Sequence, residues 1–352
     1  MPDKPNGVAS PAYAGLLRDF YRGRKVLVAG ADGFLGMNCV YALEKLQANI
    51  SLVSRREVPR AVGFTGTTFH GDLRASSTTR AAVAGQSVVF DFAGTMGAVE
   101  SNRNPEASLD QDCRAHLSLF QACATASTPP LVLFCSSRLV YGKPRYLPVD
   151  EKHPLNPQSI YAAHKITAEN YLQVFGKTHH LPYCIFRLSN PYGPYHFGGK
   201  KGYGIINHFL RAAAKGESIR IFGDGSQLRD YIHVNDVVTA FLLAAMSSKS
   251  WGETFNLGGR NAVSLRSAAE RISELAGGTE VIYEPWPSEQ HTVETGDYFT
   301  DTRRVESILP LPSEVDWDAG LLHALEFYRQ ECPQMAAESQ PRGIEDSRWT
   351  WR

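Results

Sequence analysis

The chain has 352 residues, with 36 basic and 36 acidic side chains, so its formal net charge at neutral pH is zero. This balance gives no general polyanion-binding surface, and nucleic acid is therefore not an expected partner. No apolar run is long enough to cross a bilayer and the first ten residues lack the apolar core of a signal peptide, so we expect a cytoplasmic protein without a membrane partner.

The first structural signal along the chain is a lead-in helix followed by a strand and a glycine-rich turn. Residues 12–22 have an amphipathic pattern, and Val26-Leu27-Val28-Ala29 predicts a buried parallel strand. Gly30-Ala31-Asp32-Gly33-Phe34-Leu35-Gly36 follows directly, and residues 37–46 then have helical periodicity. Glycine lets the backbone approach a pyrophosphate, and a helix N-terminus offers it free N–H groups. We therefore expect a dinucleotide to contact Gly30, Gly33, Phe34, Leu35 and Gly36. A glycine turn without a ligand is the alternative, and the flanking strand and helix disfavour it.

The end of the second predicted strand, residues 48–53, bears on the choice of dinucleotide. A carboxylate usually stands there and bonds the ribose 2′-hydroxyl of NAD. Here the strand ends in Ser54-Arg55-Arg56. Because a guanidinium binds a 2′-phosphate that a carboxylate would repel, Ser54, Arg55 and Arg56 favour NADP(H) over NAD. In the alternative interpretation, both arginines are solvated or one stacks on the adenine of NAD.

Two further strand ends are expected beside the cofactor. His70-Gly71-Asp72-Leu73 closes a third strand, with Asp72 and Leu73 near the adenine. Asp72 is equally well explained as the cap of the next helix. A fourth strand within residues 87–94 opens into a turn of small residues, where Ala93 would contact the middle of the dinucleotide.

A serine, a tyrosine and a lysine form the candidate catalytic group. The buried strand at 131–135 leads into Ser136-Ser137, and Tyr161 and Lys165 follow on a predicted helix at spacing i, i+4, which places them on one face. A phenol has a pKa of about 10 and is a weak base at neutral pH. A lysine cation and an oxidised nicotinamide nearby favour the phenolate. Tyr161 would then take the proton of a substrate hydroxyl while Ser137 holds its oxygen.

These motifs, in this order, resemble the extended short-chain dehydrogenase/reductase family, and within it the nucleotide-sugar epimerase/dehydratase group, over roughly residues 22 to 330. In that family the serine five places before the glycine of the Ser-x-x-Val-Tyr-Gly pattern is catalytic, which selects Ser137 over Ser136. The family's tyrosine and lysine correspond to Tyr161 and Lys165.

The resemblance also implies a nucleotide-sugar site in the second half of the chain. Residues 187–194 resemble the segment that crosses toward the substrate, where Asn190 would bind phosphate. Residues 222–234 resemble the segment in which Arg229 grips the diphosphate. Met96 would lie opposite the sugar, and so would His196, either as a further acid or base or as a solvated loop residue.

The sequence departs from the family pattern near this site. Arg138-Leu139 stands where 4,6-dehydratases carry Asp-Glu, so dehydration lacks its acid and base. Leu139 also replaces the cysteine of GDP-mannose 3,5-epimerase. His291 stands about where an arginine often makes a second diphosphate contact.

The alternation of strands and helices predicts an α/β fold with a doubly wound parallel sheet of the Rossmann type. We expect a dinucleotide-binding domain over residues 1–182, a smaller mixed substrate domain over 183–330 that is partly interleaved with it, and a polar tail over 331–352. By analogy with the family, helices at 107–126 and 159–176 would form a homodimer seam. The six cysteines include no C-x-x-C pair, so we expect reduced thiols and no metal.

The combined interpretation is a nucleotide-sugar epimerase. It would oxidise a C4 hydroxyl by hydride transfer to bound NAD(P) and return the hydride to the other face of the 4-keto sugar. An NADPH-dependent 4-keto-sugar reductase is the alternative enzyme. A non-catalytic dinucleotide-binding scaffold or sensor is the alternative from another class, although the presence of Tyr161 and Lys165 disfavours it.

Overall fold

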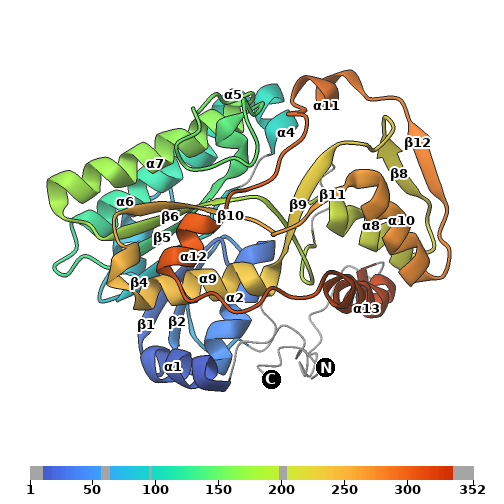
Figure 1. Ribbon diagram of the computed structural model, residues 1–352. Helices are drawn as coiled ribbons and strands as arrows, with labels where there is room; N and C mark the ends of the chain where they lie inside the picture. Colours follow the sequence, from blue (N-terminus) through green and yellow to red (C-terminus); the bar gives the residue numbers. More distant parts are fainter. Residues whose placement is uncertain (1–10, 57–63, 95–96, 198–203, 336–352) are drawn as a thin grey trace.

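The computed structural model describes residues 11–56, 64–94, 97–197 and 204–335, and a seven-stranded sheet lies at its centre (Figure 1). The strand order is β10-β6-β5-β4-β1-β2-β3, and every neighbouring pair is parallel. This arrangement confirms the predicted doubly wound sheet. The strands are β1 Lys25–Ala29, β2 Asn49–Ser54, β3 Thr67–His70, β4 Val88–Asp91, β5 Leu131–Ser137, β6 Tyr183–Leu188 and β10 Glu253–Leu257.

Helices cover both faces of this sheet, which is why its strands are apolar at consecutive positions. Side chains alternate along β1: Val26 and Val28 pack in one buried cluster, and Leu27 and Ala29 pack in another on the opposite face. The first face is covered by α1 Pro11–Tyr21, α2 Phe34–Lys45 and α9 Val234–Met246. The second face is covered by α3 Ser76–Val83, α6 Ala115–Ala124 and α7 Ile160–His179.

A smaller part of the molecule carries two minor sheets and a third buried cluster. One sheet has the order β11-β9-β7 and the other pairs β12 with β8. Their strands are β7 Asn190–Tyr192, β8 Ile219–Phe222, β9 Leu228–His233, β11 Ala262–Ser264 and β12 Val281–Glu284. The helices that pack here are α8 Ile205–Ala214, α10 Leu265–Ala276 and α13 Trp317–Met335.

The chain passes between the large sheet and the minor sheets more than once. β6 and β10 both follow residue 182 and both join the large sheet. The parallel pairing of β6 with β5 and of β10 with β6 extends that sheet on one side, so residues after 182 complete it. The apolar runs of these two strands predict burial but do not specify which sheet they enter.

The lead-in helix is present as α1, and Tyr21 at its end donates a hydrogen bond to the carbonyl of Leu242, at 2.9 Å. This bond and the apolar contacts of Leu17 fasten the start of the described chain against α9. None of the helices in the ranges 11–56, 64–94, 97–197 and 204–335 is long and apolar enough to cross a membrane.

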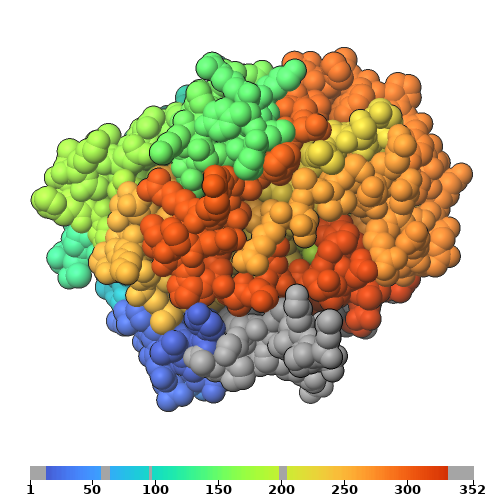
Figure 2. Space-filling view, in the orientation of Figure 1, coloured from blue at the N-terminus to red at the C-terminus, as the bar shows by residue number. Residues whose placement is uncertain are grey.

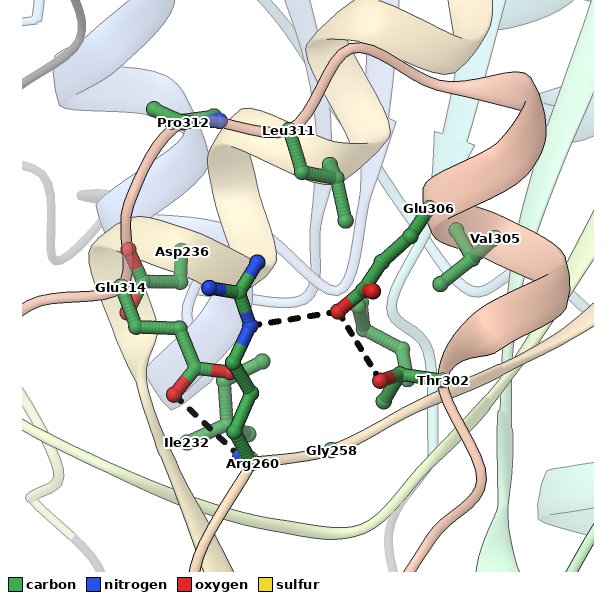
Figure 3. A pocket seen from close by; sticks show the side chains of 11 residues that line it. Ile232, Asp236, Gly258, Arg260, Thr302, Val305, Glu306, Leu311, Pro312 and Glu314 are labelled. Carbon is green, nitrogen blue, oxygen red and sulfur yellow. Dashed lines mark hydrogen bonds and ion pairs between the residues drawn. The ribbon is translucent and has the colours of Figure 1, made fainter.

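The C-terminal segment crosses one face of the molecule and links its two parts, as the orange-red residues in Figure 2 show. It includes α12, Arg303–Ile308, and borders a small hollow drawn in Figure 3. Arg260 lies between Glu306, which its Nε contacts at 3.2 Å, and Glu314, which accepts its backbone N–H at 3.2 Å. None of the predicted site residues lines this hollow, so we assign it to the attachment of the segment rather than to the chemistry.

Candidate active site

The glycine turn after β1 has a backbone that only glycine allows. Gly30 has a φ of +77°, and a Cβ added there would lie 2.6 Å from the carbonyl carbon of Phe92. A Cβ on Gly36 would overlap the carbonyl oxygen of Gly30. Gly33 then precedes α2, whose first N–H groups receive no side-chain cap. These features fit the pyrophosphate of a dinucleotide, with Phe34 and Leu35 partly exposed on the same turn.

Asp32 of the glycine turn lies at the end of β2, where β2 itself supplies no acidic residue. Ser54 Oγ donates to Asp32 Oδ2 at 2.5 Å and accepts from the backbone N–H of Arg56 at 3.0 Å. Arg55 and Arg56 are exposed, and within the described ranges their guanidinium groups make no hydrogen bond or ion pair. The sequence-based prediction considered the strand-terminal residues alone and missed Asp32.

Asp72, after β3, is held in a local turn. Its carboxylate accepts from the backbone N–H of Arg74 at 2.8 Å and from the Arg74 guanidinium at 2.9 and 3.0 Å. These hydrogen bonds hold the pKa of Asp72 below its usual range. Helix α3 is preceded by Ala75 and has no side-chain cap, so the alternative prediction that Asp72 caps it is wrong. Leu73 is partly buried against the core beside it.

Ser137, Tyr161 and Lys165 meet at the carboxyl end of β5. The Ser137 hydroxyl lies close enough to the phenol of Tyr161 to lower its pKa, and it accepts from the N–H of Leu139 at 3.2 Å. Lys165 Nζ donates to the carbonyl of Cys135 at 2.8 Å and lies 5.9 Å from the centroid of the Tyr161 ring. A longer bond of 3.4 Å joins Lys165 to the carbonyl of Ala93, the residue that the sequence predicts at the middle of the dinucleotide.

Burial and charge act in opposite directions on this group. Burial raises the pKa of Tyr161, while the Lys165 charge and the Ser137 hydrogen bond lower it, and the net direction is upward. For Lys165, burial disfavours the cation, but its interactions with Tyr161 and nearby acidic groups raise the pKa overall. Lys165 is therefore charged at neutral pH, and Tyr161 needs additional positive charge nearby to act as a base.

Ser136 points toward α7 but contacts it further along the helix than Tyr161 and Lys165. Its hydroxyl donates to Glu169, which is paired with Arg187 at 2.7 Å, and all three residues are buried. Consecutive residues of a strand point to opposite faces, so Ser136 and Ser137 have different partners. Ser136 is bonded to Glu169, and Ser137, at the end of the strand, is the serine beside the Tyr161 phenol.

The N-terminus of α7 is anchored by side chains that the sequence did not single out. Ser101 Oγ accepts from the backbone N–H of Tyr161, and Asn102 Oδ1 accepts from that of Ile160, each at 2.9 Å. Both come from α4, Ala98–Arg103. Since these bonds act on the backbone of Ile160 and Tyr161, they fix the start of α7 with respect to α4.

Arg229 is buried on β9 and is already paired. It forms an ion pair with Glu294 and donates to the carbonyls of Leu228 and Gly296. His291 stands where relatives often have an arginine that contacts the diphosphate, and from the same segment an acid, Glu294, reaches Arg229. His291 itself is exposed.

Arg138 lies beside the predicted phosphate ligand Asn190. Its Nε donates to Asn190 Oδ1 at 3.3 Å and its Nη1 donates to Thr295 Oγ1 at 3.1 Å. Asn190 Nδ2 donates in turn to the carbonyl of Asp230 at 3.0 Å. Burial, followed by the charge of Arg229, lowers the pKa of Arg138 to about 10, so it remains charged at neutral pH. The sequence marked position 138 only as the absence of an acid.

His196 is buried where the glycine turn meets the smaller part of the molecule. Its ring lies 5.2 Å from that of Phe34, and its Nδ1 is 3.1 Å from Arg211 Nη1. Burial and the Arg211 charge lower its pKa to about 4. His196 is therefore neutral at neutral pH, and the alternative of a solvated loop histidine is wrong. Met96, predicted opposite the sugar, lies outside the described residues.

The cysteines and potential metal ligands complete the description of the site. Cys39, Cys113, Cys123, Cys135 and Cys184 are buried free thiols. In the part of the chain that the structure describes, no group of three His, Cys, Asp or Glu side chains is arranged to hold a metal ion.

Comparisons with known proteins agree with this geometry. Residues 26–258 match the NAD dependent epimerase/dehydratase family. The UDP-glucose 4-epimerase of Mycolicibacterium smegmatis is 30% identical over 247 residues, which are 69% of this chain and 76% of that protein.

Solved structures of two proteins extend the similarity over most of the chain. The UDP-N-acetylglucosamine 4-epimerase of Methanobrevibacter ruminantium M1, solved with UDP-N-acetylmuramic acid, is 25% identical with a TM-score of 0.81, covering 88% of this chain and 99% of that one. MoeE5 was solved with UDP-glucose and NAD and also with UDP-glucuronic acid and NAD. It is 28% identical with a TM-score of 0.78, and the two complexes cover 88% and 87% of this chain and 99% of their own. The chain thus belongs to the NAD-dependent epimerase/dehydratase family, among nucleotide-sugar epimerases of the extended short-chain dehydrogenase/reductase type.

Proposed function

We propose that this protein is a UDP-sugar 4-epimerase that recycles a tightly bound dinucleotide within each turnover. The observation that carries the proposal is the convergence of Ser137, Tyr161 and Lys165 beside the glycine turn. Such a group removes a hydroxyl proton while a hydride leaves the same carbon, which converts an alcohol to a ketone. Reversal of both transfers on the other face of the ketone inverts the carbon with no net redox change.

Each residue has a distinct part in this cycle. The Tyr161 phenolate accepts the proton of the C4 hydroxyl and later returns it to the keto oxygen. Ser137 donates a hydrogen bond to that oxygen, and the Lys165 cation stabilises the phenolate. Oxidised nicotinamide, when bound, takes the C4 hydride, returns it, and adds the positive charge that favours the phenolate.

For the dinucleotide we propose NAD, in place of the NADP(H) that the arginines after β2 favour. Asp32 supports this choice, because its carboxylate is fixed by Ser54 at the end of β2, where the ribose 2′-hydroxyl is bound in this fold. A carboxylate there accepts a hydrogen bond from a hydroxyl and repels a 2′-phosphate. Arg55 and Arg56 are exposed and unpaired in the described ranges, so they are free to remain in solvent. MoeE5 was solved with NAD, which agrees with the proposal.

The test of the cofactor compares the wild type with Asp32→Asn. Asparagine still accepts the Ser54 hydrogen bond but removes the charge. We expect the wild type to bind NAD at least tenfold more tightly than NADP, and the variant to bind NADP more tightly than the wild type does. If Asp32→Asn leaves the ratio of the two affinities unchanged, Asp32 does not select the cofactor.

Uridine diphosphate sugars are the proposed substrates, because both structurally similar proteins were solved with UDP-linked ligands. Arg138 and Asn190, close to Ser137 in the fold, offer the polar groups that such a diphosphate sugar requires. The charge balance of 36 basic and 36 acidic residues gives no reason to add a nucleic-acid partner.

The decisive experiment denatures the purified protein and identifies the released dinucleotide and its redox state by mass. Stoichiometric oxidised NAD, together with inversion of a UDP-sugar without added dinucleotide, is the expected result. An empty protein that consumes NADPH with a 4-keto sugar would instead establish the reductase alternative. Retained dinucleotide and an unchanged biological effect of Tyr161→Phe would indicate the scaffold alternative.

We also propose a homodimer formed through α6, α7 and the helical segment Leu109–Arg114 that precedes α6. Large apolar side chains are exposed on these segments: Leu109 is 52% exposed, Leu117 39% and Val174 55%. Exposed apolar side chains gathered on neighbouring helices support an interface. Light scattering should give twice the chain mass, and Leu117→Asp should shift the protein toward the monomer. We expect the protein in the cytoplasm, which fractionation tests.

A further inference from the structure

We infer that Arg138 is the residue that binds an oxyanion of the nucleotide sugar in this site, a role that the sequence pattern assigns to Arg229. The inference rests on the proposed function and deepens it. The oxyanion belongs either to the diphosphate or to a carboxylate on the sugar, and both present the same chemistry to a guanidinium.

The first argument is the charge of Arg138 within its surroundings. The side chain is only 9% exposed, and within the described ranges it forms no ion pair. Its hydrogen-bond partners are the neutral oxygens of Asn190 and Thr295, and its guanidinium carbon lies 4.8 Å from the ring centroid of Tyr298. Asp230 and Glu294 attract this cation without bonding it, so its buried charge has no direct acidic partner, and an anionic ligand would supply one.

The second argument is the position of Arg138 relative to the reacting group. It follows Ser137 directly, and Ser137 lies beside the phenol of Tyr161. On its other side it contacts Asn190, the predicted phosphate ligand, at 3.3 Å. A ligand whose C4 oxygen lies at Ser137 therefore has its neighbouring substituents within reach of the Arg138 guanidinium. Within the described ranges, Nη2 makes no hydrogen bond, so this nitrogen is free to donate to a ligand.

The third argument is that, of Arg138 and Arg229, Arg138 is the arginine that has no directly bonded acid in the described ranges. Arg229 forms an ion pair with Glu294, whose side chain is 26% exposed. Asp230, the other acid nearby, accepts from Ser189 Oγ and from the N–H of Thr300 and bonds neither arginine. Arg229 and Arg138 repel one another, and an oxyanion beside Arg138 relieves that repulsion.

The test measures binding of UDP, UDP-glucose and UDP-glucuronic acid by calorimetry to the wild type, Arg138→Gln and Arg138→Lys, each with its retained dinucleotide. Arg260→Gln is the control, because it makes the same substitution at an arginine that lines the hollow in Figure 3, and Ser137 is not part of that lining. We expect Arg138→Gln to weaken binding at least tenfold, Arg138→Lys to restore part of the loss, and the control to bind as the wild type does.

The three ligands distinguish the two sources of the oxyanion. Equal weakening for all three assigns the Arg138 contact to the diphosphate. Weakening for UDP-glucuronic acid alone assigns it to a sugar carboxylate, and the wild type then prefers that acidic ligand. Both results support the inference. A folded Arg138→Gln protein that binds all three ligands like the wild type overturns it and leaves the proposed function intact. A wild type that binds none of the three overturns the proposed function and this assignment with it.

Discussion

Replacement of Lys165 by methionine tests the electrostatic basis of the proposed chemistry. Methionine keeps the length and apolar volume of the stem and removes the charge. Lys165 Nζ lies 5.9 Å from the centroid of the Tyr161 ring. With an effective dielectric constant of about 20, two unit charges at that separation interact by about 3 kcal/mol, which corresponds to about two pKa units.

The expected result follows from the direction of that interaction. The Lys165 charge lowers the pKa of Tyr161, so its removal raises that pKa by about two units. Where activity depends on the phenolate, kcat at neutral pH falls about 100-fold and the acidic limb of the pH–rate profile moves upward by about two units. The assay is epimerisation of a UDP-sugar between about pH 6 and 10, with the bound dinucleotide quantified for each sample.

Lys177→Met is the control for this substitution, because Lys177 is an exposed lysine near the end of the same helix. Its profile should match the wild type. Lys165 also donates to the carbonyl of Cys135, so a melting curve must show that Lys165→Met remains folded. A uniform loss of rate at every pH, with an unshifted limb and full dinucleotide content, would refute the electrostatic reasoning.

Three further predictions concern other parts of the account. Ser137→Ala should lower kcat roughly 100-fold with little change in melting temperature. Ser136→Ala should lower the melting temperature, because Ser136 bonds the buried Glu169, and should leave kcat unchanged. The reverse pattern would contradict the assignment of Ser137 as the serine that binds the substrate oxygen. Gly36→Ala should abolish retention of dinucleotide during purification, because the added Cβ overlaps the Gly30 carbonyl and would displace the glycine turn. Retained cofactor in the variant would refute the proposed contact between this turn and the dinucleotide. Burial raises the pKa of Asp236 to about 7, so between about pH 4 and 7 the folded protein holds a proton that the unfolded chain releases, and stability should fall as the pH rises through this range. Asp236→Asn should flatten this pH dependence of the melting temperature. An unchanged slope in the variant would count against the assignment to Asp236.

The sequence was sufficient for features that depend on local spacing. The strand, glycine turn and helix from Val26 to Lys45 follow from periodicity and glycine placement, and the structure confirms them. The spacing of Tyr161 and Lys165 puts both on one helix face, and the strand alternation separates Ser136 from Ser137. These arguments need only the dihedral preferences of short segments.

Features that depend on contacts between distant segments were not predictable in this way. Asp32 reaches Ser54 across 22 residues, and it changes the cofactor preference inferred from the end of β2. Glu294 pairs with Arg229 across 65 residues, which occupies the arginine that the sequence pattern assigns to the diphosphate. The burial of Arg138 without a directly bonded acid in the described ranges likewise emerges only when three segments pack together. Charge pairing of this kind depends on tertiary geometry and leaves no local periodicity.

The most direct test of internal hydride recycling uses UDP-sugars deuterated at C4, without added dinucleotide. Glucose, N-acetylglucosamine and glucuronic acid derivatives cover the proposed substrate class. The account predicts that at least one is inverted at C4, with the deuterium retained at C4 of the product and no net change in dinucleotide redox state. Loss of deuterium to solvent during inversion, or turnover of any of them only when NADPH is supplied, would contradict it.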